Sequence, residues 1–77
     1  MKIEVYIKPG CQYCVLSKEL LEKKNISFTS HEIGKDVTVD EVLEKFPSAK
    51  TVPIILVDNE WIGGYNDLSS FLREKEK

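Results

Sequence analysis

What this chain lacks already excludes several kinds of protein. It has only two cysteines among its 77 residues, so any disulfide chemistry must use that pair, and a zinc ion bound to both would find no further cysteine ligands. It has no apolar run close to the roughly 20 residues of a membrane-spanning helix. Its net charge is −2, with acidic and basic residues interleaved, unlike the basic stripe of a nucleic-acid-binding protein. The sequence therefore predicts no nucleic-acid partner, no membrane span and no metal site.

The chain is also too short for more than one domain, and it contains no repeat or linker. We therefore expect a single domain over residues 1–77. Apolar residues make up 42% of the chain, as they do in globular proteins. The first residues enter a predicted strand directly, which leaves no place for a signal peptide, and we expect a cytoplasmic monomer. In that reducing compartment a cysteine pair is expected to be catalytic or metal-binding rather than a structural disulfide.

Patterns of apolar residues predict the elements of the first half. A strand is expected over residues 3–7, where apolar side chains alternate with more polar neighbours that include Tyr6. A helix is expected from residue 11 to about residue 24, behind a Lys-Pro-Gly break, with Asn25 as its end. A weaker strand is expected over residues 26–33. The apolar face of the helix is predicted to contain Val15, Leu16, Leu20 and Leu21.

The second predicted helix begins with a capping box, because Thr38 is followed three residues later by Glu41. In this motif each of the two side chains accepts a hydrogen bond from the other residue's backbone N–H group, which fixes the start of the helix. Pro47 cannot continue the helix and closes it. The side chains predicted to face inward from this helix are Val39, Val42, Leu43 and Phe46.

A hairpin and a third helix complete the chain. An apolar strand is expected over residues 54–57, a turn at residues 58–59 and a return strand over residues 60–62. Two glycines end that strand, and the last helix is expected to begin at residue 66 or 67. The order is β-α-β-α-β-β-α, and a right-handed crossover makes the first two strands parallel. We therefore expect an α/β fold in which a four-stranded mixed sheet is flanked by three helices.

Residues 11–14, with the sequence C-Q-Y-C, stand between the first predicted strand and the first predicted helix. A C-x-x-C pair in that position is typical of thioredoxin-like redox proteins. Cys11 falls at the expected helix N-terminus, where unpaired N–H groups favour a thiolate, and Lys8 adds a nearby positive charge. Cys14 falls one turn inside the helix and should be more buried. We therefore assign Cys11 as the nucleophile and Cys14 as the resolving thiol.

Three motifs together resemble the dithiol glutaredoxins, which are small members of the thioredoxin-fold superfamily. They are K-P-G-C-Q-Y-C at residues 8–14, T-V-P at residues 51–53 and G-G-Y-N-D-L at residues 63–68. The departure is Gln12, which stands where common dithiol members carry proline. The resemblance implies a glutathione-dependent thiol–disulfide oxidoreductase that reduces protein disulfides and glutathione mixed disulfides. It also implies glutathione as co-substrate, no bound cofactor, and ribonucleotide reductase as a family-typical protein partner.

The resemblance further implies a glutathione site beside the cysteines. A cis bond at Val52-Pro53 would expose the Val52 backbone to an extended tripeptide. The glycine carboxylate of glutathione would then meet Lys8 and either Lys45 or Lys50. Its γ-glutamyl carboxylate would meet N–H groups at the start of the last helix, an anion site by geometry. The expected glutathione-binding residues are Lys8, Tyr13, Lys50, Thr51, Val52, Pro53, Gly64, Asn66 and Asp67.

Other interpretations remain open from the sequence. The chain could be a redoxin that a thioredoxin reductase, rather than glutathione, reduces. It could instead carry an iron–sulfur cluster, which would need two chains and two glutathiones, since one exposed thiolate per chain cannot supply four ligands. Asp67 could serve only as a helix N-cap, and Tyr13 could be only a surface aromatic. His31 and Trp61 are expected to have structural roles.

Overall fold

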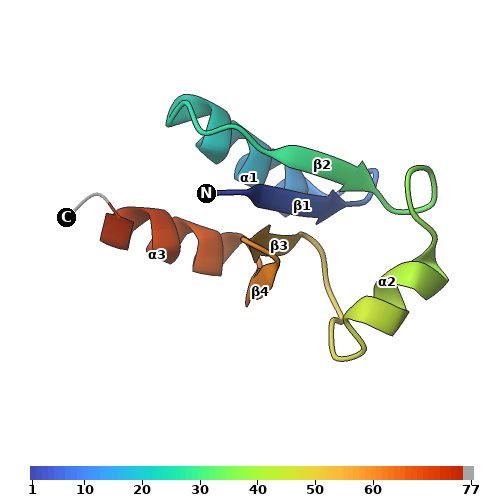
Figure 1. The fold of residues 1–77 in the computed structure, drawn as a ribbon. Coiled ribbons are helices and arrows are strands. Elements are labelled where there is room, and N and C mark those ends of the chain that lie inside the picture. The colour runs from blue at the N-terminus through green and yellow to red at the C-terminus, as the bar shows by residue number, and fades with distance from the viewer. Residues whose placement is uncertain (76–77) are drawn as a thin grey trace.

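The computed structural model describes residues 1–75, and its elements follow the predicted order (Figure 1). None of the helices in that range combines the length and the apolar character needed to span a bilayer. The strands are β1 (Ile3–Ile7), β2 (Thr29–Glu32), β3 (Ile54–Val57) and β4 (Glu60–Gly63), and the helices are α1 (Gln12–Lys23), α2 (Val39–Lys45) and α3 (Tyr65–Lys75).

The four strands form one mixed sheet in the order β2-β1-β3-β4. β1 runs parallel to β2, with Val5 opposite Ser30, and antiparallel to β3, with Val5 opposite Ile55. β3 pairs antiparallel with β4 through a turn at Asp58 and Asn59, whose φ angles are 51° and 69°. Two positive φ angles suit the twist of a tight hairpin. The α/β class, the mixed sheet and the predicted strand pairings are confirmed.

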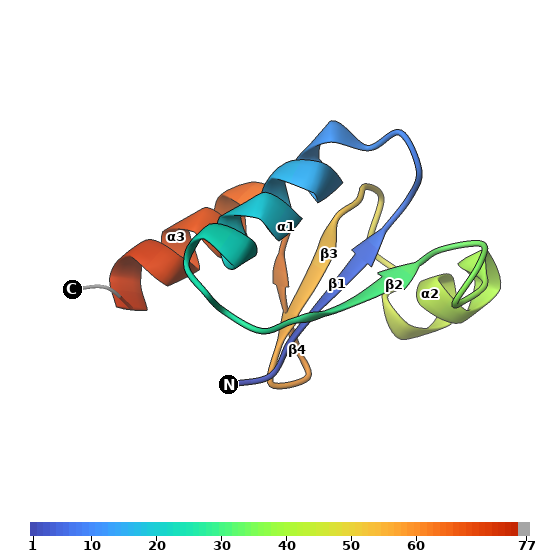
Figure 2. The ribbon, with the colours of Figure 1, turned by 90° about the horizontal axis from the view of Figure 1, so that it is seen from above.

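Helices cover both faces of this sheet, with α1 and α3 on one side and α2 on the other (Figure 2). On the α2 side, the Tyr6 side chain is buried and its ring packs edge-on against Phe46, with centroids 5.6 Å apart. The prediction that Tyr6 lies on the polar face of β1 is wrong, because α2 covers that face. The core under α1 and α3 consists of Ile3, Val5, Leu21, Ile55, Val57, Leu68 and Leu72.

Two helices bury narrower stripes than their apolar patterns predict. In α1, Val15 is 54% exposed, while the small polar Ser17 is buried and donates a hydrogen bond to the Tyr13 carbonyl at 2.8 Å. In α2, Val39 and Leu43 are each 48% exposed, although they were expected to face inward. Val42 and the C-cap residue Phe46 are the members of this stripe that pack against the sheet.

Two element boundaries also differ from the prediction. β2 begins at Thr29 rather than at residue 26, because the preceding segment still closes α1: the Ile26 N–H group donates to the Leu21 carbonyl at 2.9 Å. α3 begins at Tyr65, earlier than residue 66 or 67. The strand before it ends at Gly63, whose φ angle of 128° turns the chain and allows the helix to start at once.

The two side chains expected to be structural have ordinary partners. His31 Nε2 lies 3.3 Å from Glu4 Oε1, and its ring stacks on Tyr6 with centroids 4.8 Å apart. Trp61 packs edge-on against Phe46, with centroids 5.7 Å apart. These contacts confirm His31 as a satisfied histidine and Trp61 as a packing residue on the hairpin.

Candidate active site

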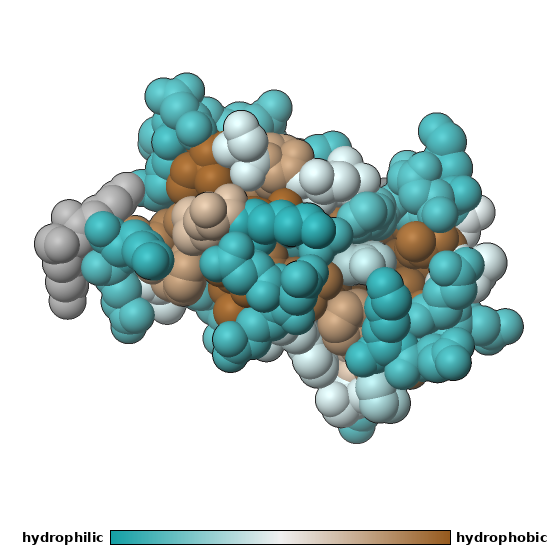
Figure 3. Space-filling view, viewed as in Figure 1, coloured by the Kyte–Doolittle hydropathy of each residue, from teal (hydrophilic) through white to brown (hydrophobic). Residues whose placement is uncertain are grey.

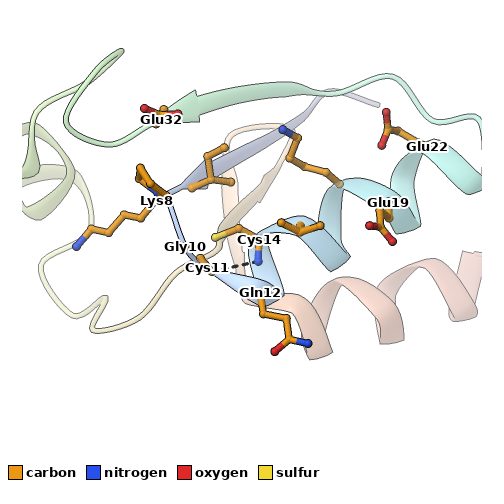
Figure 4. A pocket seen from close by; sticks show the side chains of 12 residues that line it. Lys8, Gly10, Cys11, Gln12, Cys14, Glu19, Glu22 and Glu32 are labelled. Atoms are coloured by element: carbon orange, nitrogen blue, oxygen red, sulfur yellow. Dashed lines mark hydrogen bonds between the residues drawn. The ribbon is translucent and has the colours of Figure 1, made fainter.

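Cys11 occupies the N-cap of α1, with an extended backbone (φ −91°, ψ 110°). Its Sγ atom accepts a hydrogen bond from the Cys14 backbone N–H group at 3.1 Å, drawn as the dashed line in Figure 4. Cys11 remains partly exposed, so an outside disulfide can approach its sulfur. An N–H donor at the positive end of a helix stabilises negative charge on the sulfur that it meets. The structure therefore confirms the predicted position of Cys11 and suits it to act as a nucleophile.

Cys14 differs from Cys11 in its burial. Its side chain is only 2% exposed, and the thiol is free. Burial raises the pKa of the Cys14 thiol from 9.0 to about 12, with further contributions from a hydrogen bond to the Cys11 side chain and from the charge of Cys11. The backbone of Lys8 opposes this shift by hydrogen bonding to the Cys14 sulfur. Cys14 therefore stays protonated at neutral pH while Cys11 faces solvent.

The loop before β3 brings a distant segment to the nucleophile. The Val52-Pro53 peptide bond is cis, as the resemblance implied. The Cys11 thiol donates to the Val52 carbonyl at 3.8 Å, across 41 positions of sequence. Pro53 is buried. The Val52 carbonyl is therefore the part of this loop that meets the sulfur.

The start of α3 closes the other side of the site. Gly64 precedes the helix, and its N–H group donates to Asp67 Oδ2 at 3.1 Å. Asp67 is the third residue of α3 and not its N-cap. Its carboxylate accepts a hydrogen bond from the residue that precedes the helix. A Cβ atom on Gly63 would collide with that carboxylate. A side chain at Gly63 is thus excluded both by this contact and by the positive φ angle.

A hollow of about 440 Å³ lies between these parts and will be called the Tyr13 hollow. Tyr65 is the one lining residue that the sequence did not single out. Its ring lies beside that of Tyr13, with centroids 5.9 Å apart. Its place inside the G-G-Y-N-D-L motif was the available signal. The lining residues are Tyr13, Thr51, Val52, Pro53, Gly64, Tyr65, Asn66 and Asp67.

The three candidate lysines lie outside the Tyr13 hollow. Lys8 and Lys50 line a neighbouring hollow together with Thr51 and Val52. Figure 4 shows the Lys8 side chain extending away from the two cysteines, toward the segment between α2 and β3. Lys45 lies in a different depression, against Phe46 and the outer part of β1. The structure therefore places Lys50, and not Lys45, near the active site.

A further hollow, of about 580 Å³, is lined by both cysteines (Figure 4). It lies between the turn after β1, the outer face of α1 and the end of β2. Its charged lining residues are Lys8, Lys18, Glu19, Glu22 and Glu32. Within residues 1–75, no three His, Cys, Asp or Glu side chains gather as a metal-binding group would require.

Known proteins share this combination of sequence and fold. A sequence model of the Glutaredoxin family matches residues 3–62. Glutaredoxin 1 of Rickettsia prowazekii is 38% identical over 77 residues, covering 96% of this chain and 78% of that protein. The hybrid peroxiredoxin hyPrx5 of Haemophilus influenzae is 35% identical over 69 residues. That match covers 90% of this chain but only 28% of the peroxiredoxin.

Solved structures agree with the sequence comparisons. The structure of reduced Escherichia coli glutaredoxin superimposes with a TM-score of 0.80 at 30% identity, covering 99% of this chain and 98% of that one. The match therefore includes the sheet, all three helices and the segments that surround Cys11. This chain belongs to the glutaredoxin family of thiol–disulfide oxidoreductases.

Proposed function

We propose that this glutaredoxin uses glutathione as its reductant and reduces both protein disulfides and glutathione mixed disulfides. The observation that supports this most is the Tyr13 hollow beside Cys11, with Val52 on one wall and a helix N-terminus on the other. Its volume of about 440 Å³ suits a small peptide ligand. Recycling by glutathione fits a reducing compartment, and we propose the cytoplasm.

The proposed binding mode uses each wall for one part of the tripeptide. The extended backbone of glutathione pairs with Val52 as an added antiparallel strand, with its sulfur directed at Cys11. Its γ-glutamyl carboxylate accepts from N–H groups in the first turn of α3, where an anion is favoured. Its ammonium group approaches the Asp67 carboxylate. Its glycine carboxylate points along the loop toward Lys8 and Lys50.

The chemistry consists of successive exchanges of one sulfur–sulfur bond. With a glutathione mixed disulfide, the Cys11 thiolate attacks the glutathione sulfur, and the substrate sulfur leaves as a thiolate and takes up a proton. A second glutathione thiolate then attacks the bound glutathione sulfur. This step releases oxidised glutathione and restores the Cys11 thiolate.

With a protein disulfide, the Cys11 thiolate attacks one sulfur of the substrate, and the other substrate sulfur leaves as a thiolate and takes up a proton, which gives a mixed disulfide between Cys11 and the substrate. Cys14 then loses its proton and attacks the Cys11 sulfur, which expels the substrate as a thiol and leaves a Cys11–Cys14 disulfide. Two glutathiones reduce this disulfide and leave as oxidised glutathione. The proximity of the two cysteines within one helical turn makes the second step intramolecular.

Serine variants separate these roles. Cys11→Ser should reduce turnover of a glutathionylated substrate to the uncatalysed background, because the attacking sulfur is gone. Cys14→Ser should retain that activity, since a second glutathione completes the cycle, and should lose reduction of protein disulfides. Full activity of Cys11→Ser would reject the assignment of the nucleophile.

The reductant needs a test of its own. The oxidised wild-type protein should be reduced by glutathione, and thioredoxin reductase with its nicotinamide cofactor should reduce it far more slowly. Mass spectrometry should find the glutathione adduct on Cys11 when Cys14→Ser is treated with oxidised glutathione. Efficient reduction by the reductase alone, with no glutathione adduct, would favour the reductase-dependent redoxin.

A further inference from the structure

A second hollow continues from the active site along α2, and it will be called the α2 groove. Its volume is about 220 Å³, several times the roughly 30 Å³ that one water molecule occupies in the liquid. Lys8 and Lys50 are its charged lining residues, and Thr51 adds a hydroxyl group. The other lining residues are apolar: Ile33, Val39, Val42, Leu43, Ala49, Val52 and Ile54.

One wall of the α2 groove consists of side chains that the fold leaves uncovered. Val39 and Leu43 lie one helical turn apart and are each 48% exposed, whereas Val42 between them is buried. Figure 3 shows hydrophobic surface reaching solvent over α2, at the right of the view. Withdrawing such side chains from water is favourable, so an apolar partner group would gain free energy by covering them.

The α2 groove adjoins the Tyr13 hollow. Thr51 and Val52 line both, and the Val52 carbonyl lies 3.8 Å from Cys11 Sγ. A polypeptide paired with the Val52 backbone would therefore pass the nucleophile and continue into the groove. In the proposed binding mode the glycine end of glutathione points to Lys8 and Lys50. The residues that follow a substrate cysteine would run in this same direction.

The length of glutathione explains why it would leave the apolar wall of the groove uncovered. Successive side chains of an extended chain point to opposite faces, so the residue two positions after the cysteine points to the same face as the cysteine. That residue lies about 7 Å further along the chain. Glutathione ends one residue after its cysteine and carries no side chain there. Only a longer polypeptide can place an apolar side chain against Val39 and Leu43.

We propose that the α2 groove selects polypeptide disulfides that carry an apolar side chain two positions after the reacting cysteine, next to an acidic residue. The apolar side chain would cover Val39 and Leu43. The side chain of the acidic residue would start on the opposite face of the extended chain, and the long, flexible side chains of Lys8 and Lys50 would reach its carboxylate; these two are the charged residues, among those the structure describes, that line the groove. This inference rests on the proposed function, because the direction of the bound chain follows from the glutathione orientation.

Three synthetic peptides test the proposal, each as a symmetrical disulfide dimer joined through one cysteine. The first carries glutamate and then leucine after the cysteine; the second replaces that leucine with serine; the third moves the leucine to two positions before the cysteine. Each turnover consumes one dimer and two glutathiones and yields two peptide thiols and one oxidised glutathione. The wild-type kcat/KM should favour the first peptide by about fivefold to tenfold over the other two, as partial burial of one aliphatic side chain predicts.

Variants assign that preference to the groove. Leu43→Ser and Val39→Ser should each remove most of the preference for the first peptide. Val15→Ser is the matched control, because Val15 is a 54% exposed aliphatic residue on a helix at the other side of the cysteines, and it should retain the preference. Far-ultraviolet circular dichroism of each variant checks that it is folded.

A small substrate distinguishes failure of this inference from failure of the proposed function. The mixed disulfide of glutathione and 2-mercaptoethanol has no side chain that can lie against Val39 and Leu43, so all three variants should reduce it at the wild-type rate. Equal rates for the three peptides, or a preference that survives in both Leu43→Ser and Val39→Ser, would overturn the role of the groove. If the wild-type protein has no activity on the small mixed disulfide, the proposed function would be rejected instead.

Discussion

Cys14 should become easier to deprotonate when Cys11 no longer presents a free sulfur. Three effects raise the pKa of the Cys14 thiol to about 12: burial, which is the largest, then a hydrogen bond with the Cys11 side chain and the charge of Cys11. Replacing Cys11 with alanine removes the second and third effects and leaves the burial. The pKa of Cys14 in Cys11→Ala should therefore fall below 12 but stay above the ordinary value of 9.0.

The size of the pKa shift determines how much Cys14 thiolate is present during turnover. A shift from 9.0 to about 12 corresponds to about 4 kcal/mol in favour of the protonated thiol. At pH 7 the thiolate fraction of Cys14 is then on the order of 10⁻⁵, about a thousand times smaller than for an unperturbed thiol. A substrate mixed disulfide on Cys11 removes the same two effects as the alanine substitution. Cys14 would thus become more nucleophilic only after Cys11 has reacted.

Thiolate absorbance at 240 nm measures this directly. The titration of Cys11→Ala is compared with that of the double variant Cys11→Ala/Cys14→Ala, which subtracts the tyrosines. The rate of alkylation of Cys14 by iodoacetamide as a function of pH gives an independent value. A Cys14 that titrates at or below pH 9 in the wild-type protein would refute the argument. So would a Cys14 that titrates at the same pH with and without the Cys11 side chain.

Two further predictions concern stability. Because the pKa of Cys14 is higher in the folded protein than in the unfolded chain, its stabilising contribution is complete below pH 9 and is lost as pH rises toward 12, at about 1.4 kcal/mol per pH unit. Urea unfolding of wild type and Cys14→Ala at pH 8–11 should show this slope only in the wild type, and parallel pH profiles would contradict it. Gly63→Ala should destabilise the fold by roughly 1–3 kcal/mol, because φ is 128° and the new Cβ meets the Asp67 carboxylate. In the same assay the control Gly64→Ala should cost less, since its Cβ would make only an ordinary contact with the Pro53 carbonyl at 3.5 Å.

Local interactions made much of this fold predictable from the sequence. The capping box forms as expected, with Glu41 N–H donating to Thr38 Oγ1 at 3.1 Å. The positive φ angles at Asp58 and Asn59 fit a turn that such residues favour. The placement of Cys11 at a helix start followed from a C-x-x-C pair between a strand and a helix. Each of these features depends on neighbours within a few residues, which is why the amino-acid order alone reveals them.

The family resemblance extended the prediction to contacts that periodicity cannot reveal. It anticipated the cis bond before Pro53 and the approach of this loop to the cysteines, and the structure contains both. It also named most of the lining of the Tyr13 hollow, but it omitted Tyr65, and although it listed Lys50 among the binding residues it left Lys45 open as an alternative. The choice between these lysines depends on where the chain between α2 and β3 turns, which the spacing of residues does not specify.

The amino-acid sequence by itself thus determined the order of the elements, the α/β class and the identity of the reactive pair. Only the tertiary structure decided which apolar side chains are covered, because that depends on what packs against each face. Tyr6 is buried since α2 lies over it, whereas Val39 and Leu43 stay half-exposed since nothing in the described chain lies over them. Tertiary packing also created the difference between the two thiols, because the pKa of Cys14 responds to its burial and to Cys11. Burial is a property of the whole packed domain, and the residues nearest in sequence do not set it.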